Sequence, residues 1–326
     1  MIPILLIIIG ILCLGSCSTE RHGIDTIFLD LGHNLGDHVR SKIVDHFDTV
    51  NVQVFDFTKN FDKVFRSKSS LIVSLGNSSS WLQIVPNYSF HNLPHEGFVI
   101  YHDIYNGTVP IIYSNGKPMS PHMISNTSTL KEWIHYGAVA GAYAVLEELG
   151  FGFMHPLSVV RPSWLTINIT EYHKKSSRIE KPYWPDRNFH IHTQHPLELT
   201  EVLQGMDVPM GGPLSSNCTA GHATADPGKH RGAYCERWED MVPDVDMMFQ
   251  WSVANRLNKV EWMLLGNYKW GSFDASDMRQ KRLRLLTSLG HDYGLLVGAD
   301  VPLGNTQQHA WSMVNTRLPF HKQVGA

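Results

Sequence analysis

One segment, residues 129–156 (TLKEWIHYGAVAGAYAVLEELGFGFMHP), constrains the fold more than any other part of the chain. Thr129 is followed three residues later by a glutamate, which is the spacing of a helix capping box. Gly150 is placed to end the helix in the left-handed conformation. Gly137 and Gly141 lie one turn apart among alanines, so one side of the helix carries almost no side-chain bulk. We therefore expect a core helix that packs very closely against its neighbours.

The residues before this helix alternate between strand and helix patterns. Apolar or β-branched runs at 26–31, 51–57 and 71–75 have the length of strands, and a helical pattern lies at 37–47. Two further strand-like runs flank Asn106-Gly107, which is a strong signal for a β-hairpin. The sequence thus predicts a small α/β sandwich domain over residues 24–156.

The second half of the chain begins with a break in these patterns. Residues 157–185 contain several prolines and a charged stretch, and we interpret them as a linker. After it, strand and helix patterns alternate, which predicts parallel strands with helices on the outside. The expected strands are 188–193, 259–265 and 295–301, and the expected helices are 245–256 and 276–289, the last ending at Gly290.

The helical pattern G-A-x-x-G-A-Y-x-x-L-E-E-L-G, followed by aromatic residues and His-Pro, resembles a helix of known enzymes. It is similar to the last helix of the small α/β domain that precedes the catalytic barrel in glycoside hydrolases of family 20, the β-N-acetylhexosaminidases, and of family 67, the α-glucuronidases. The resemblance implies an α/β fold in which residues 186–326 form the first part of a (β/α)₈ TIM barrel.

The resemblance also suggests residues that contact a sugar. Tyr183-Trp184-Pro185-Asp186-Arg187 is similar to the opening of the family 20 barrel, which gives Arg187 the role of holding sugar hydroxyls. A guanidinium fork suits paired hydroxyls or a carboxylate. Asp300, at the end of the strand 295–301, matches an aspartate of the same family. His190 and His192 stand where that family has other sugar contacts, so they complete the expected substrate-binding set.

His190 and His192 also permit a different interpretation. Two histidines at i and i+2 of a strand lie on the same face and can bind one metal ion, as in amidohydrolase-type barrels. The alternation of side chains along a strand distinguishes the two interpretations, because a regular strand places Arg187 on the opposite face from both histidines. A metal-dependent amidohydrolase therefore remains an alternative, while the glycosidase reading requires no cofactor.

The resemblance does not extend to the carboxylates that glycoside hydrolysis needs. Family 20 enzymes place an adjacent Asp-Glu pair after the fourth barrel strand, and no such pair occurs in this sequence. We expect a glycoside-hydrolase-like protein related to enzymes acting on amino-sugar or uronic-acid glycosides, inactive as this chain alone. A non-catalytic carbohydrate-binding glycoprotein is a further alternative.

The first residues and the sequons predict a secretory route. An apolar run over residues 2–14, followed by small residues, resembles a signal peptide that we place at 1–18, and it is too short to span a bilayer comfortably. Six N-x-Ser/Thr sequons are typical of a secreted or lysosomal glycoprotein. The expected glycosylation sites are Asn77, Asn87, Asn106, Asn126, Asn168 and Asn217.

Cysteine and charge content narrow the class of protein further. With a signal peptide removed, Cys218 and Cys235 remain, and in an oxidising compartment we expect them to form a disulfide rather than half of a zinc site. The net charge of -3 gives no basic field for nucleic acid. We expect a carbohydrate partner, no nucleic acid, and no membrane span in the mature chain.

Overall fold

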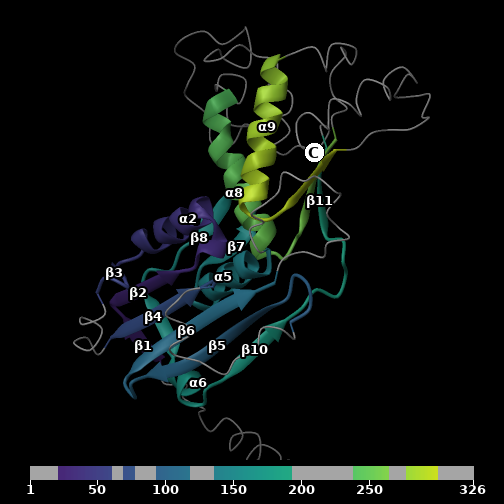
Figure 1. Ribbon diagram of the computed structural model, residues 1–326. Helices are drawn as coiled ribbons and strands as arrows, with labels where there is room; N and C mark the ends of the chain where they lie inside the picture. Colours follow the sequence, from purple (N-terminus) through teal and green to yellow (C-terminus); the bar gives the residue numbers. More distant parts are fainter. Residues whose placement is uncertain are drawn as a thin grey trace, which may run out of the picture.

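The computed structural model describes residues 21–60, 69–77, 93–117, 136–192, 238–263 and 277–299. These residues form a mixed α/β structure with two main parts (Figure 1). The N-terminal domain is built around a six-stranded sheet, and the parallel unit consists of three strands with two helices. Among the described helices, none is both long and apolar enough to cross a bilayer.

The six-stranded sheet has the order β10-β5-β6-β4-β2-β3. Strands β2, β3, β4 and β6 run parallel, while β5 pairs antiparallel with both β6 and β10. The strands span β2 Thr26–Leu31, β3 Gln53–Asp56, β4 Ser70–Leu75, β5 Phe98–Tyr105, β6 Val109–Gly116 and β10 Ser177–Glu180. The predicted strands and the hairpin at Asn106-Gly107 are confirmed, and both turn residues have positive φ values of 48° and 75°.

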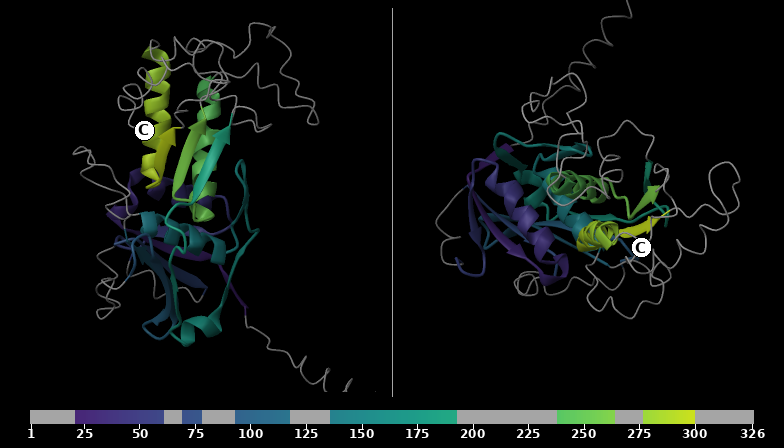
Figure 2. Two further views of the ribbon diagram at one scale, coloured as in Figure 1. Left: turned by 90° about the vertical axis from the view of Figure 1, so that its right-hand side faces the viewer. Right: turned by 90° about the horizontal axis from the view of Figure 1, so that it is seen from above.

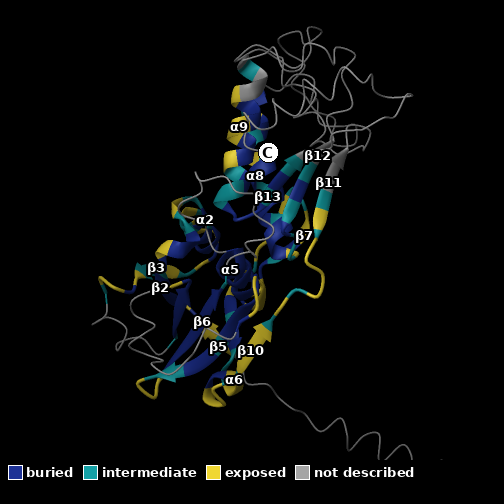
Figure 3. Cartoon of the chain, turned by 45° about the vertical axis from the view of Figure 1, so that its right-hand side comes forward, coloured by how far each residue is buried: buried dark blue, intermediate teal, exposed yellow. Residues whose placement is uncertain are grey.

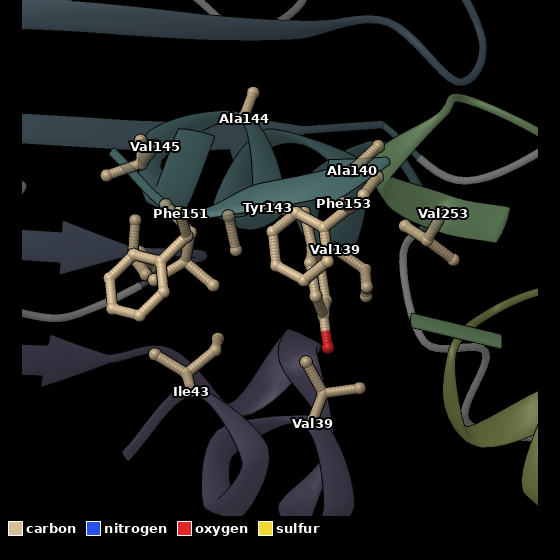
Figure 4. Close-up of a cluster of buried hydrophobic side chains, with 14 of the residues drawn as sticks. Val39, Ile43, Val139, Ala140, Tyr143, Ala144, Val145, Phe151, Phe153 and Val253 are labelled. Atoms are coloured by element: carbon tan, nitrogen blue, oxygen red, sulfur yellow. The ribbon is translucent and has the colours of Figure 1, made fainter. Parts of the chain in front are cut away.

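Helices α2 (Asp37–Asp48) and α5 (Tyr136–Glu148) cover one face of this sheet (Figure 1). Every residue of α5 from Tyr136 to Leu146 is buried, because the sheet lies on one side and α2 and α8 on the other. Figure 4 shows Val139 and Tyr143 of α5 beside Val39 and Ile43 of α2. The helix ends as the sequence predicts, with Gly150 at a φ of 99°. Its predicted start at Thr129 lies outside the described residues.

The segment 157–185, which the sequence pattern suggests is a linker, carries regular structure of its own. It contains β8 (Ser158–Val160), β9 (Leu165–Asn168), the short helix α6 (Ile169–His173) and β10. Strand β8 pairs with β7 (Gly152–His155), β9 pairs with β1 (Arg21–Ile24), and β10 extends the main sheet beyond β5. These residues are therefore built into the N-terminal domain, and only the last few of them lead on to the parallel unit.

The parallel unit contains β11 (Asn188–His192), β12 (Lys259–Met263) and β13 (Leu296–Ala299), which pair in that order. Helix α8 (Val242–Ala254), preceded by the 3-10 turn η6 (Trp238–Met241), and helix α9 (Asp277–Asp292) lie on the same side of the strands (Figure 2). The predicted parallel βα alternation is thus confirmed. The described strands form an open sheet, so the closed TIM barrel stays a prediction.

Helix α9 does not end at Gly290 as its sequence suggests. It continues to Asp292, and the chain turns at Gly294, which has a φ of 73°. Gly290 serves packing instead, since a Cβ atom there would lie 2.6 Å from Cγ2 of Val297. A tertiary contact with β13, not the need for a left-handed residue, therefore accounts for this glycine.

Candidate functional site

The three parallel strands bring together residues that are far apart in the sequence. Their register aligns His190 with Glu261, and Glu261 with Gly298. Two residues earlier along the strands, Asn188 aligns with Lys259, and two residues later, His192 aligns with Met263. Because side chains alternate along a strand, these positions all belong to one face of the sheet.

The opposite face is the apolar one, and the helices cover it. Val260 is completely buried, Val297 is nearly so, and Phe189 contacts Trp251 of α8 with ring centroids 5.1 Å apart. Figure 2 shows α8 and α9 on that side of the strands. The face that carries Asn188, Lys259 and Glu261 has no helix over it among the described residues. We call this the helix-free face.

Polar side chains on the helix-free face form a connected group. Nδ2 of Asn188 donates to Oε2 of Glu261 at 2.6 Å, and Nζ of Lys259 forms an ion pair with Oε1 of Glu261. Asp186 lies 4.0 Å from the same ammonium group. The Glu261 side chain is 17% exposed, which is low for a carboxylate and keeps its contacts partly shielded from water.

Gly298 provides the space that Glu261 occupies. A Cβ atom at position 298 would lie 3.2 Å from Cγ of Glu261, closer than ordinary van der Waals contact. A larger residue at position 298 would therefore require the Glu261 side chain to shift by a few tenths of an ångström. The row His190, Glu261 and Gly298 is thus a place where the sheet holds an acidic side chain beside a histidine position.

Sequence reasoning missed Glu261, although a signal for it was present. The stretch Lys259-Val260-Glu261-Trp262-Met263 alternates polar and apolar residues up to position 262. In a strand that is buried on one face only, such alternation places the polar residues on the other face. Among the described residues, Glu261 is the only carboxylate within β11, β12 and β13, and Asp186 lies just before β11.

Arg187 lies at the amino end of β11 and points into the domain interface. Its Nη2 pairs with the Glu96 carboxylate, Nε donates to the carbonyl oxygen of Arg256 at 2.6 Å, and Nη1 donates to that of Trp184 at 2.5 Å. Burial alone would lower the pKa of Arg187, but the Glu96 carboxylate outweighs this and raises the pKa. Substrate binding by Arg187 stays a prediction, and its present contacts join the two parts of the molecule.

Other predicted site residues lie partly or wholly outside the described region. His190 and His192 belong to β11, but only their backbone is described, so their sugar-binding and metal-binding roles stay predictions. Within the described ranges, no group of three or more His, Cys, Asp or Glu side chains could hold a metal ion. Asp300, Cys218 and Cys235 are outside the described residues.

The structure describes three of the predicted glycosylation sites, and two of these lie on the surface. Asn77 and Asn106 are exposed, and Asn168 is half-buried at the start of α6, where its side chain accepts a hydrogen bond from the Thr170 backbone. Asn87, Asn126 and Asn217 are outside the described residues.

No family model and no curated protein matches this sequence. Solved structures do match, and two of them resemble it weakly. CpGH84B matches with a TM-score of 0.41 at 9% identity, and CpGH84D with a TM-score of 0.38 at 8% identity. Each match covers 94% of this chain, which spans 40% of the first structure and 41% of the second. Similarity at this level carries no functional argument.

Proposed function

We propose that this chain is a secreted, glycoside-hydrolase-like protein that binds amino-sugar or uronic-acid glycosides on the helix-free face of β11, β12 and β13. The observation that carries the proposal is the polar group of Asn188, Lys259 and Glu261 on the helix-free face of the parallel sheet. In a (β/α)₈ barrel this is the inner face, and ligands bind where it reaches the carboxyl ends of the strands. Asn188 and Lys259 are the first residues of β11 and β12, so Glu261, the third residue of β12, is the member of the group that lies nearest those ends.

The chemistry of this group suits a sugar. A carboxylate accepts hydrogen bonds from two hydroxyl groups, while an ammonium and an amide donate to ring or carbonyl oxygens. Hydrolysis would need a second carboxylate, about 5–9.5 Å from the first. Asp186, the other carboxylate of this group among the described residues, lies before the amino end of β11, whereas barrel enzymes hold their catalytic groups at the carboxyl ends of the strands. The proposal for this chain is therefore binding without turnover.

The test uses the full chain and measures binding and hydrolysis separately. Methyl β-N-acetylglucosaminide should bind in ligand-observed NMR, and Glu261→Gln should weaken binding about tenfold, since hydrogen bonds to a charged group contribute about 1.5–3 kcal/mol. Aryl β-N-acetylhexosaminides and aryl α-glucuronides should not be hydrolysed.

The matched control is Glu171→Gln, which removes the same charge from the exposed side of α6. It should bind the sugar as the unmodified chain does. Equal binding by the Glu261→Gln variant would refute the assignment of the helix-free face. Turnover by this chain would instead show that its carboxylates lie elsewhere, and would direct attention to His190 and His192.

A further inference from the structure

A second candidate site lies between the two parts of the molecule, away from the helix-free face. It is a pocket of about 270 Å³, formed where the segment joining β10 to β11 passes over the start of β5 and α5. The volume is slightly below the range of about 300–1,000 Å³ that drug-sized ligands occupy, so it suits a single ring. Its lining includes Phe98, Tyr136 and Pro182, together with charged residues described below.

Two residues of the pocket have strained backbones. Glu96 and Arg256 have φ values of 60° and 63°, in the left-handed region that residues with a Cβ rarely adopt. Glu96 is held there by Asn258, whose Nδ2 donates to its carboxylate at 3.1 Å, and by its ion pair with Arg187. A strained backbone of this kind persists only where the surrounding structure stabilises it. Such residues are concentrated at ligand-binding sites.

Hydrogen bonds and contacts with aromatic rings hold the charged side chains at the floor of the pocket. The Arg187 guanidinium lies 5.8 Å from the ring centroid of Tyr136, and that of Arg256 lies 5.4 Å from the ring centroid of Phe98. Burial raises the pKa of Tyr136 to about 12, so its hydroxyl stays protonated and donates to the carbonyl oxygen of Leu257 at 2.8 Å. A ligand therefore meets a preformed surface.

The mouth of the pocket carries two exposed aromatic side chains. Tyr183 is 86% exposed and Trp184 is 66% exposed, and their rings meet edge to face with centroids 4.9 Å apart. Figure 3 shows the segment between β10 and β11 as exposed over most of its length. Flat aromatic faces next to polar groups match a sugar ring, which has apolar C–H faces and a polar rim.

The charges of the pocket select the kind of sugar. Arg187 pairs with Glu96, and Arg256 pairs with Glu147 at 2.9 Å and with Glu180 at 3.2 Å. Lys181 also lines the pocket, and it has no ion-pair partner among the described residues. Lys181 is therefore the cationic side chain of the lining that an anionic group of a ligand can pair with.

We propose that this interdomain pocket binds a six-membered sugar ring that carries a carboxylate, using Trp184 as the stacking surface and Lys181 as the partner of the carboxylate. The site is separate from the helix-free face and does not depend on the function proposed for it. It would place an acidic saccharide against the junction of the two parts of the molecule.

The experiment titrates the full chain with D-glucuronate and with D-glucose, following tryptophan fluorescence and ligand-observed NMR. We expect glucuronate to bind about fivefold more tightly than glucose, the contribution of one exposed ion pair. Lys181→Met should abolish this preference. Trp184→Ala should weaken binding of both sugars about tenfold or more, because it removes the stacking surface.

Matched controls exist for both variants. Lys174→Met removes an exposed lysine and Trp164→Ala removes an exposed tryptophan, 69% accessible, that does not line the pocket. Both should bind glucuronate as the unmodified chain does. Because Lys181 and Trp184 are exposed, their variants should keep the circular dichroism and melting temperature of the unmodified chain.

Four results would overturn the proposal. One is an unchanged affinity in Trp184→Ala, and another is an equal affinity for glucose and glucuronate in the unmodified chain. The third is tighter binding of 4-hydroxybenzoate than of glucuronate, since that would show a pocket for aromatic acids. Absence of any binding up to the solubility of the sugar would refute it as well.

Discussion

His46 shows how a single polar side chain is accommodated in the core of the N-terminal domain. It is 6% exposed and contacts the rings of Phe151 and Phe153 edge to face, with centroids 5.5 and 5.6 Å away. Its Nε2 forms a hydrogen bond of 2.8 Å with Oε1 of Gln250 on α8. Burial lowers the pKa of His46 below 6.5, because the aromatic surroundings disfavour the charged imidazolium.

This residue predicts a dependence of stability on pH. The unfolded chain binds a proton at His46 more readily than the folded chain does, so folding stability should fall as the pH drops below about 6.5. His46→Gln should reduce the loss of stability between pH 7 and pH 5 in urea denaturation. His291, whose pKa burial also lowers, contributes in the same direction and leaves a residual slope.

The control for this prediction is His173→Gln, which changes an exposed histidine at the end of α6. That variant should keep the slope of the unmodified chain. An identical slope in His46→Gln would mean that other groups set the acid sensitivity.

Helix α5 is the element on which the packing of the N-terminal domain depends. Its glycines allow backbone to approach backbone, as the small-residue side of the helix predicts. A Cβ atom at Gly137 would lie 2.6 Å from the carbonyl oxygens of both Gly97 and Lys117. Backbone atoms cannot move aside as a flexible side chain can, so this close approach excludes every other residue.

The consequence is that Gly137→Ala should destabilise the protein, although alanine is the better helix former by about 1 kcal/mol. We expect a net loss of about 3 kcal/mol from the clash, measured by urea denaturation. Gly23→Ala is the matched control, because a Cβ atom there meets nothing within 4 Å. A stability change in Gly137→Ala no larger than in this control would show that the helix can shift at little cost.

At the scale of the whole molecule, Asp246 joins the two parts. It lies on α8 and is 5% exposed, and it accepts hydrogen bonds from Nε2 of His38 at 2.7 Å and from the Tyr293 hydroxyl at 2.8 Å. Nζ of Lys42 on α2 forms an ion pair with it at 3.0 Å. Burial would raise the pKa of Asp246, but these donors outweigh it and the pKa is lowered.

Replacing this carboxylate should loosen the contact between α2 and α8. Asp246→Asn keeps the shape but removes the charge facing Lys42, and we expect a loss of about 2 kcal/mol in the free energy of unfolding. Asp48→Asn, at the exposed end of α2, should change it by less than about 0.5 kcal/mol. Indistinguishable denaturation curves for the two variants would contradict the role of Asp246.

The sequence by itself determined the elements whose signals are local. Strand β2, helix α2, the hairpin at Asn106-Gly107 and the helix end at Gly150 all follow patterns that span a few residues, because periodicity and turn chemistry act over that range. The parallel βα alternation of the second half was predicted for the same reason, and the structure confirms it among the described strands.

Only the tertiary structure decided which distant residues meet. Arg187 pairs with Glu96, 91 positions away, and His38 reaches Asp246, 208 positions away, and no local pattern encodes either pair. For the same reason, local sequence patterns could not predict the pairing of β10 with β5 or the packing role of Gly290. Charged side chains are buried only when a partner compensates the loss of water, and the fold alone supplies that partner.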